Sequence, residues 1–132
     1  MSGVWEDATI ASRIRYNRLS TLSSSNITLV SGALSGEIRN VYSVKAIHTL
    51  VLGGIGDVKV YLNEVDASGI VTTIGQVSLG SGAENTQMEF APGQNPDPLK
   101  PFYQLQGNAR MDIRANISGI VDAVALWWWD VL

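Results

Sequence analysis

The chain has 132 residues, a net charge of −3 and no cysteine. This length fits one domain with its own hydrophobic core, and the lack of cysteine excludes disulfide frameworks and thiolate metal sites. The small negative charge gives no support for nucleic acid as a partner. Charged residues make up 16% of the sequence, against ~25% in typical soluble domains. Either a surface that is partly covered in an assembly or a compact β-domain rich in Ser, Thr, Asn and Gly would show this figure.

Neither a secretory signal nor a membrane span is evident in the sequence. Residues 1–7 lack a basic region followed by a long apolar run, and no segment reaches the ~18 apolar residues of a membrane span. Residues 123–129 are strongly apolar, but Asp122 and Asp130 bracket them. We therefore expect a soluble chain that is made in the cytoplasm and has no membrane partner.

Residues 1–26 differ in kind from the rest of the chain. Ile10, Ile14 and Tyr16 fit the alternation of a strand, but Ile10 and Ile14 also fit the spacing of a helix, so periodicity does not decide between the two. The Ser-rich residues 20–26 resemble a linker. We predict an N-terminal arm and linker over residues 1–26, followed by a β-sandwich domain over residues 27–132. The arm is either a first strand behind a disordered start or an extended segment that docks onto a neighbouring subunit.

From residue 27 onwards, glycine and proline separate short runs rich in valine, isoleucine, threonine and aromatic residues. This pattern is typical of an all-β sandwich or barrel. The clearest strand is 111–117, where apolar and polar residues alternate strictly. We predict strands near residues 27–31, 37–42, 44–52, 57–63, 70–79, 86–91, 101–106, 109–117 and 120–131.

Two connections between these strands have a clear composition. Gly53, Gly54 and Gly56 predict a hairpin turn, and they do not form a phosphate-binding loop because the Gly-Lys-Ser/Thr ending is absent. Residues 91–101 contain all 4 prolines of the chain, which excludes a central strand or a helix there. We predict a surface loop, a place where small β-domains often make contacts.

No combination of residues in the sequence predicts catalysis. His48 is the only histidine, and it falls on the strand face of Val44 and Ala46, so we interpret it as a satisfied, partly buried residue. No nucleophile motif accompanies it, and the acidic residues of 57–97 match no calcium-binding loop. We expect no enzyme activity, no cofactor and no metal. A hydrolase in which His48 meets a distant carboxylate is a weaker alternative.

Three consecutive tryptophans stand near the end of the last predicted strand. Neighbouring strand residues point to opposite faces, so Trp127 and Trp129 share one face and Trp128 lies on the other. Trp127 and Trp129 fall in line with Ala123 and other small apolar residues, which predicts that they belong to the core. Trp128 shares its face with Leu126, and this face suits a protein contact, cover by the arm, or stacking on a sugar ring.

The middle of the chain resembles small virion proteins of tailed bacteriophages. The residues that carry the resemblance cover about 37–131. They are a strand at 44–52, a glycine turn, strands at 57–62 and 76–79, a Pro-Gly turn at 92–93, and a strand at 109–117 before a last hydrophobic strand. The resemblance implies a jelly-roll-like antiparallel β-sandwich that serves as a head decoration or cement protein, or as a tail or fibre component. The proline loop and the tryptophan-rich end depart from the pattern.

We therefore expect a structural virion protein, a capsid decoration or cement protein that binds and stabilises a phage head. Its expected partners are further copies of the chain, in a dimer or trimer, and a major capsid protein. The alternatives are a phage tail or fibre protein and a carbohydrate-binding β-sandwich module. The residues expected at the protein interface are Trp5, Ile10, Arg13, Ile14, Arg15, Tyr16, Arg18, Leu126 and Trp128.

Overall fold

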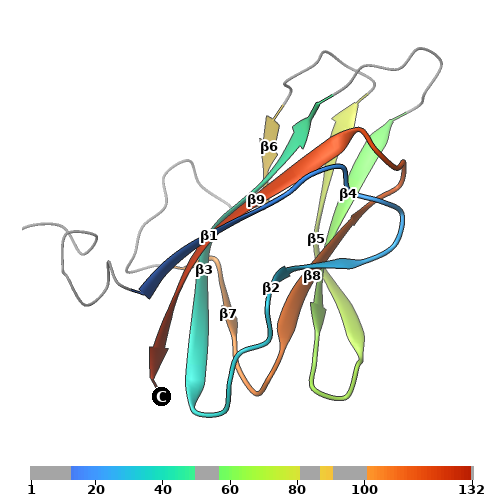
Figure 1. The fold of residues 1–132 in the computed structure, drawn as a ribbon. Helices are drawn as coiled ribbons and strands as arrows, with labels where there is room; N and C mark the ends of the chain where they lie inside the picture. Colours follow the sequence, from blue (N-terminus) through green and yellow to red (C-terminus); the bar gives the residue numbers. More distant parts are fainter. Residues whose placement is uncertain (1–12, 50–56, 81–86, 91–100, 132) are drawn as a thin grey trace, which may run out of the picture.

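The computed structural model describes residues 13–49, 57–80, 87–90 and 101–131, and its elements are all strands (Figure 1). None of the described residues forms a helix that could cross a membrane. The Gly53–Gly56 turn, the loop over 91–100, Trp5 and Ile10 lie outside the described residues. The strands are β1 (Ile14–Leu19), β2 (Ile27–Val30), β3 (Glu37–His48), β4 (Val58–Val65), β5 (Val71–Gly80), β6 (Gln87–Glu89), β7 (Tyr103–Leu105), β8 (Arg110–Ala115) and β9 (Val121–Val131).

The strands form two sheets, which we name sheet A and sheet B. Sheet A has the order β1-β9-β3, and β6 and β7 both pair with β3 at different points along its length. Sheet B has the order β2-β8-β4-β5. All of these pairs are antiparallel. The predicted all-β antiparallel sandwich is therefore confirmed.

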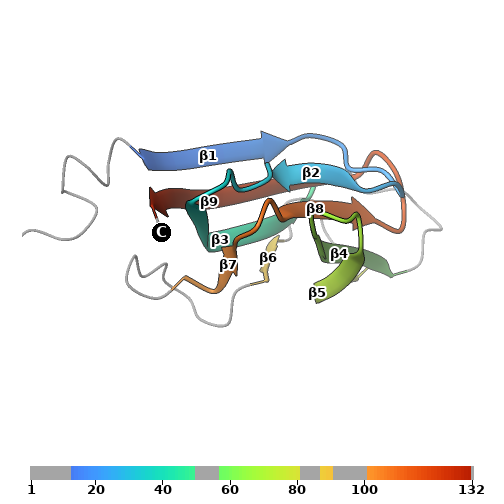
Figure 2. The same ribbon diagram turned by 90° about the horizontal axis from the view of Figure 1, so that it is seen from below.

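The strand pairs are nested along the chain, and they alternate between the sheets. The innermost pair, β4 with β5, lies in sheet B, and β3 with β6 and β7 lies in sheet A. Next outward, β2 pairs with β8 in sheet B, and the outermost pair, β1 with β9, lies in sheet A. A long hairpin wrapped in this way is a jelly roll. The strand order thus agrees with the expected fold (Figures 1 and 2).

The core lies between the two sheets and is built from alternate residues of the longer strands. Because side chains of a strand point to opposite faces, alternate residues are buried over 58–62 of β4, 111–115 of β8 and 121–127 of β9. The fully buried members include Leu62, Met111 and Ile113 of sheet B, and Val44 and Ala123 of sheet A. The alternation predicted for 111–117 thus places the expected residues in the core.

Strand β3 joins the two predicted strands 37–42 and 44–52 through an irregularity. Val41 pairs with Trp127 and Ser43 pairs with Leu126, so Tyr42 is an extra residue on β3. Such a bulge places two successive residues, Tyr42 and Ser43, on the same side of the sheet. The sequence alternation breaks at the same point, which explains why two strands were predicted where one continuous strand is found.

The described part of the segment 1–26 is built into the sandwich of its own chain. Ile14–Leu19 forms β1, an edge strand that pairs with β9 from Ile14 opposite Trp128 to Leu19 opposite Ala123. The following residues cross to sheet B, and Leu22 is 1% exposed and donates its N–H to Val121 O at 2.7 Å. Of the strand and helix that the periodicity left open, residues 14–19 adopt the strand.

Candidate functional site

The outer face of sheet B carries polar side chains that hydrogen-bond to one another, with Val71 exposed at the start of β5. Asn63 donates from Nδ2 to Asn26 Oδ1 at 2.8 Å and accepts at Oδ1 from Thr73 Oγ1 at 2.8 Å. Asp112 accepts from Thr28 Oγ1 at 3.0 Å and from Arg110 Nε at 3.1 Å. A sheet face with this chemistry is suited to water.

The outer face of sheet A has a different chemistry, because apolar side chains of β1 and β9 gather on it. The strand register brings Ile14 beside Trp128 and Tyr16 beside Leu126. Tyr16 is 64% exposed, whereas Leu126 and Trp128 are half-buried. We call this surface the apolar face. Its residues are Ile14, Tyr16, Ile38, Ile47, Val124, Leu126 and Trp128, with Tyr42 buried against Trp128. Asn40, Ser43 and Lys45 of β3 lie on the same side of the sheet.

Ion pairs within the chain lie at the rim of the apolar face. Arg13 Nη1 lies 2.8 Å from Asp130 Oδ1 at the end of the face near Trp128. Lys45 Nζ lies 3.4 Å from Glu89 Oε1 on the side of β6. The third pair joins Arg18 to Asp122 at 2.7 Å. The cations of these pairs therefore already have carboxylate partners.

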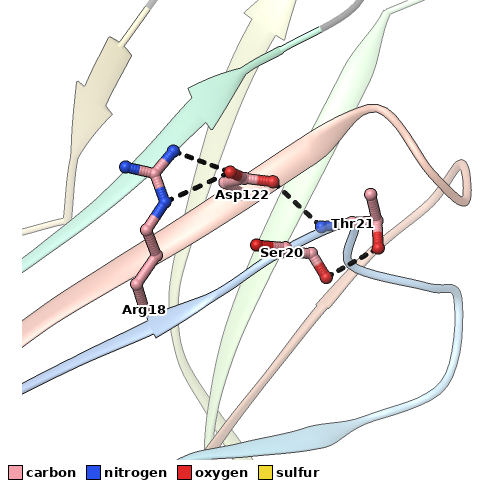
Figure 3. A network of polar contacts seen from close by, with 4 residues as sticks. All are labelled: Arg18, Ser20, Thr21 and Asp122. Atoms are coloured by element: carbon pink, nitrogen blue, oxygen red, sulfur yellow. Dashed lines mark hydrogen bonds and ion pairs between the residues drawn. The ribbon is translucent and has the colours of Figure 1, made fainter.

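Asp122 also holds the turn that leaves β1 (Figure 3). Its carboxylate accepts from Arg18 Nε at 3.3 Å and Nη2 at 2.7 Å, and from the Thr21 backbone N–H at 2.9 Å. The hydrogen bond and the charge of Asp122 raise the pKa of Arg18 above its ordinary value, so the guanidinium stays charged. Thr21 has a φ of 52°, which is uncommon for a residue with a Cβ.

The structure brings together five of the nine residues expected at the interface. Ile14, Tyr16, Arg18, Leu126 and Trp128 share the outer side of sheet A. Arg15 pairs with Trp127 and therefore lies on the opposite side of β1. Arg13 precedes β1 and places its guanidinium 4.6 Å from the centre of the Trp129 ring. Trp5 and Ile10 lie outside the described residues.

Trp127 and Trp129 lie on the inner side of sheet A, as the alternation predicted. Trp127 is 8% exposed and belongs to the core, and Trp129 is partly buried against it. The guanidinium of Arg39 lies 4.7 Å from the Trp127 ring centre. Arg39 is itself 8% exposed and donates from Nη1 to Ser31 O at 2.7 Å and from Nε to Glu37 Oε1 at 2.6 Å. Arg39 was not predicted as a core residue, and its only signal in the sequence is its place one residue after the outward-facing Ile38.

Trp128 lies against Tyr42, a contact that was not predicted from the sequence. The indole N–H donates to the Tyr42 hydroxyl, the two rings are parallel within 4°, and their centroids are 6.3 Å apart. Strand β1 lies beside β9 and not across Trp128, because Ile14 is the residue opposite Trp128 in the pairing. The neighbour that holds the Trp128 ring is therefore Tyr42 of the same sheet, in a position that the β3 bulge sets.

A groove of about 380 Å³ adjoins Trp128 on the outer side of sheet A. It combines an aromatic ring with amide and carboxylate groups. Gln104 of β7 donates from Nε2 to Asn40 Oδ1 of β3 at 2.8 Å. The groove is lined by Ile38, Asn40, Tyr42, Pro101, Gln104, Trp128 and Asp130.

His48 lies in the core and not at the surface. It pairs with Val121, is 0% exposed, and neither ring nitrogen has a hydrogen-bond partner among the described residues. The interpretation of a satisfied, partly buried histidine is thus wrong, because the end of β3 is fully covered by the core. Within the described ranges, no group of three or more His, Asp or Glu residues is placed to hold a metal ion.

We expect the substitution His48→Leu to raise the free energy of unfolding by about 1 kcal/mol, because a buried polar group without a partner costs about 1–3 kcal/mol. Leucine has a similar volume, so the gain should not be lost to overpacking. Urea denaturation followed by circular dichroism measures the change, with Ile47→Leu on the outer side of β3 as the control. A loss of stability in the His48 variant would contradict the unpartnered imidazole.

The sequence matches no family model and no curated protein. Among solved structures, a chain of the T13 IBDV viral particle aligns over 88% of this chain with 12% identity and a TM-score of 0.35. A protein from Shewanella oneidensis aligns over 100% of this chain and 85% of its own length, with 11% identity and a TM-score of 0.28. This chain spans 31% of the viral chain. Both likenesses are too weak to bear on function.

Proposed function

We propose that the protein is a structural virion protein of a tailed phage, a capsid decoration or cement protein that binds the head through the apolar face. It works as a homo-oligomer, a dimer or trimer, and performs no catalysis. The observation that carries the proposal is the contrast between the two outer faces of the sandwich. Its jelly-roll strand order gives further support, because this architecture recurs in viral capsid proteins.

An antiparallel sheet that faces water on one side normally has polar residues there. Sheet B follows this rule through Asn63, Asp112 and their partners. Sheet A does not, since Tyr16, Leu126 and Trp128 gather at its outer side. Apolar side chains that gather on the outer face of a sheet are typical of an interaction site. Burial of several hundred Å² would supply several kcal/mol at ~25 cal/mol per Å² before the cost of association, and symmetry multiplies the contact.

The ion pairs at the rim indicate which force drives this contact. Arg13 and Arg18 are engaged by Asp130 and Asp122 of the same chain, so the contact relies on apolar burial more than on new charge pairs. Interactions between exposed charges weaken as salt is added, whereas apolar burial does not. Binding to shells should therefore persist at raised salt concentration.

A matched pair of variants tests the apolar face. Leu126→Glu adds one negative charge to this face, and Gln76→Glu adds the same charge to the outer side of sheet B, where Gln76 is exposed opposite Tyr61. We expect Leu126→Glu to weaken binding to assembled head shells by about 100-fold or more, because a charge would be buried without a partner. Gln76→Glu should bind like the unaltered chain.

Co-sedimentation with shells that lack the protein measures the binding, and circular dichroism confirms that both variants are folded. Native mass spectrometry of the same samples shows whether Leu126→Glu also dissociates a homo-oligomer. Equal shell binding by the two variants would exclude the apolar face as the docking surface. A monomeric chain with no affinity for shells would contradict the proposed function as a whole.

A further inference from the structure

We infer that the groove beside Trp128 is a binding site for a neutral sugar residue. The inference does not depend on the proposed virion role, because it rests on the chemistry of the groove alone. A volume of about 380 Å³ lies within the ~300–1,000 Å³ range of small-ligand pockets. The groove also combines an apolar platform with a few converging polar groups, as such sites do.

The aromatic platform of the groove is held in place before any ligand arrives. Trp128 is half-buried, and its indole N–H is already donated to the Tyr42 hydroxyl. The parallel arrangement of the two rings, within 4°, fixes the orientation of the indole. What Trp128 offers to the groove is therefore its apolar ring surface, which suits the C–H face of a sugar. A fixed ring loses little conformational entropy on binding.

An amide pair supplies the hydrogen bonds that a sugar ring needs. Gln104 Nε2 donates to Asn40 Oδ1, which sets the orientation of both amides. This bond leaves the Asn40 NH₂ group as a donor and the Gln104 carbonyl oxygen as an acceptor, and neither has another partner among the described residues. A sugar hydroxyl both donates and accepts, so neighbouring hydroxyls of one ring can satisfy the two groups together.

The charge of the groove selects among sugars. Asp130 lines it and forms an ion pair with Arg13 at 2.8 Å. An anionic sugar such as a sialic or uronic acid would bring its carboxylate towards that of Asp130 without a free cation among the described lining residues. The groove therefore fits a neutral hexose or N-acetylhexosamine.

Saturation-transfer NMR on the full chain tests the inference with four probes: methyl glucoside, methyl galactoside, N-acetylglucosamine and N-acetylneuraminic acid. We expect transfer to at least one neutral probe and none to the acidic probe. Trp128→Ala and Gln104→Ala should each weaken binding of that probe by about tenfold or more, which corresponds to the loss of one stacking contact or hydrogen bond. Gln104 is exposed, so its variant should fold even if Trp128→Ala does not.

Tyr16→Ala is the control, because Tyr16 lies on the apolar face but does not line the groove. It should leave sugar binding unchanged. Transfer to none of the neutral probes, or transfer that persists in Gln104→Ala, would overturn the inference, as would stronger transfer to the acidic probe. The groove shares Ile38 and Trp128 with the apolar face, whereas Leu126 does not line the groove. Shell binding that fails in Leu126→Glu while sugar binding persists would show that the two functions are lost independently.

Discussion

Replacement of Trp127 with alanine is expected to lower the free energy of unfolding by about 3–5 kcal/mol, the largest effect of any single substitution that we consider. Trp127 is 8% exposed and belongs to the core cluster, which contains residues of both sheets. Its removal would leave a cavity and would also deprive the buried Arg39 guanidinium of the ring 4.7 Å away. For a domain that is only ~5–15 kcal/mol stable, this loss is a large fraction of the total.

The adjacent Trp128→Ala substitution is the matched comparison for Trp127→Ala. Trp128 is half-buried on the outer side of sheet A, so a clearly smaller loss of stability is expected, with binding at that side affected instead. Far-UV circular dichroism in a urea titration is the suitable measurement, because both variants change the tryptophan fluorescence. Equal losses in the two variants would contradict the assignment of Trp127 to the core and Trp128 to the outer face.

This assignment of opposite faces could be predicted from the sequence, because alternation is a property of each strand by itself. The same local signal placed Met111 and Ile113 in the core and Leu126 beside Trp128 on the outer side. Where alternation breaks, as at Tyr42, the sequence predicted two separate strands in place of one bulged strand. A bulge changes the face of every following residue, and its presence depends on the partner strand.

The polar part of the groove could not be predicted for a related reason. Asn40 and Gln104 are single amides within strands, and nothing in their own sequence neighbourhoods marks them. They meet because β7 pairs with β3 in the register that sets Asn40 opposite Gln104. Such a pairing of distant segments follows from the nested strand order of the whole domain. Local periodicity carries no information about it.

The burial of Arg39 and His48 could not be predicted either, because it also depends on how distant strands pair. Arg39 pairs with Trp129 of β9, and His48 pairs with Val121 of β9. Both side chains therefore point into the core, whatever their polarity. Arg39 is satisfied there by Ser31 and Glu37, which are close in sequence but belong to the turn before β3 and to its first residue. His48 has no such partner among the described residues. Polarity alone therefore mispredicts burial where strand register decides it.

Asp122→Ala is expected to lower the free energy of unfolding by about 2–3 kcal/mol, because hydrogen bonds to a charged group each contribute about 1.5–3 kcal/mol and the substitution leaves a backbone donor unpaired. Asp122 is 7% exposed and accepts the Thr21 N–H at 2.9 Å, at the point where the chain leaves β1 for sheet B. The edge strand β1 should therefore lose its protection first. Amide hydrogen exchange of residues 14–19 would detect this local opening before the global transition.

Asp122→Asn separates the two roles of the carboxylate. The asparagine oxygen can still accept the Thr21 N–H, whereas the ion pair with Arg18 is lost. Because the Arg18 side chain is 47% exposed, solvent and salt screen that pair, and asparagine should recover most of the stability that alanine loses. The remaining difference between aspartate and asparagine should shrink as salt is added, while the loss caused by alanine should not. If asparagine proves as destabilising as alanine at all salt concentrations, the bond to Thr21 is not what holds β1 against β9.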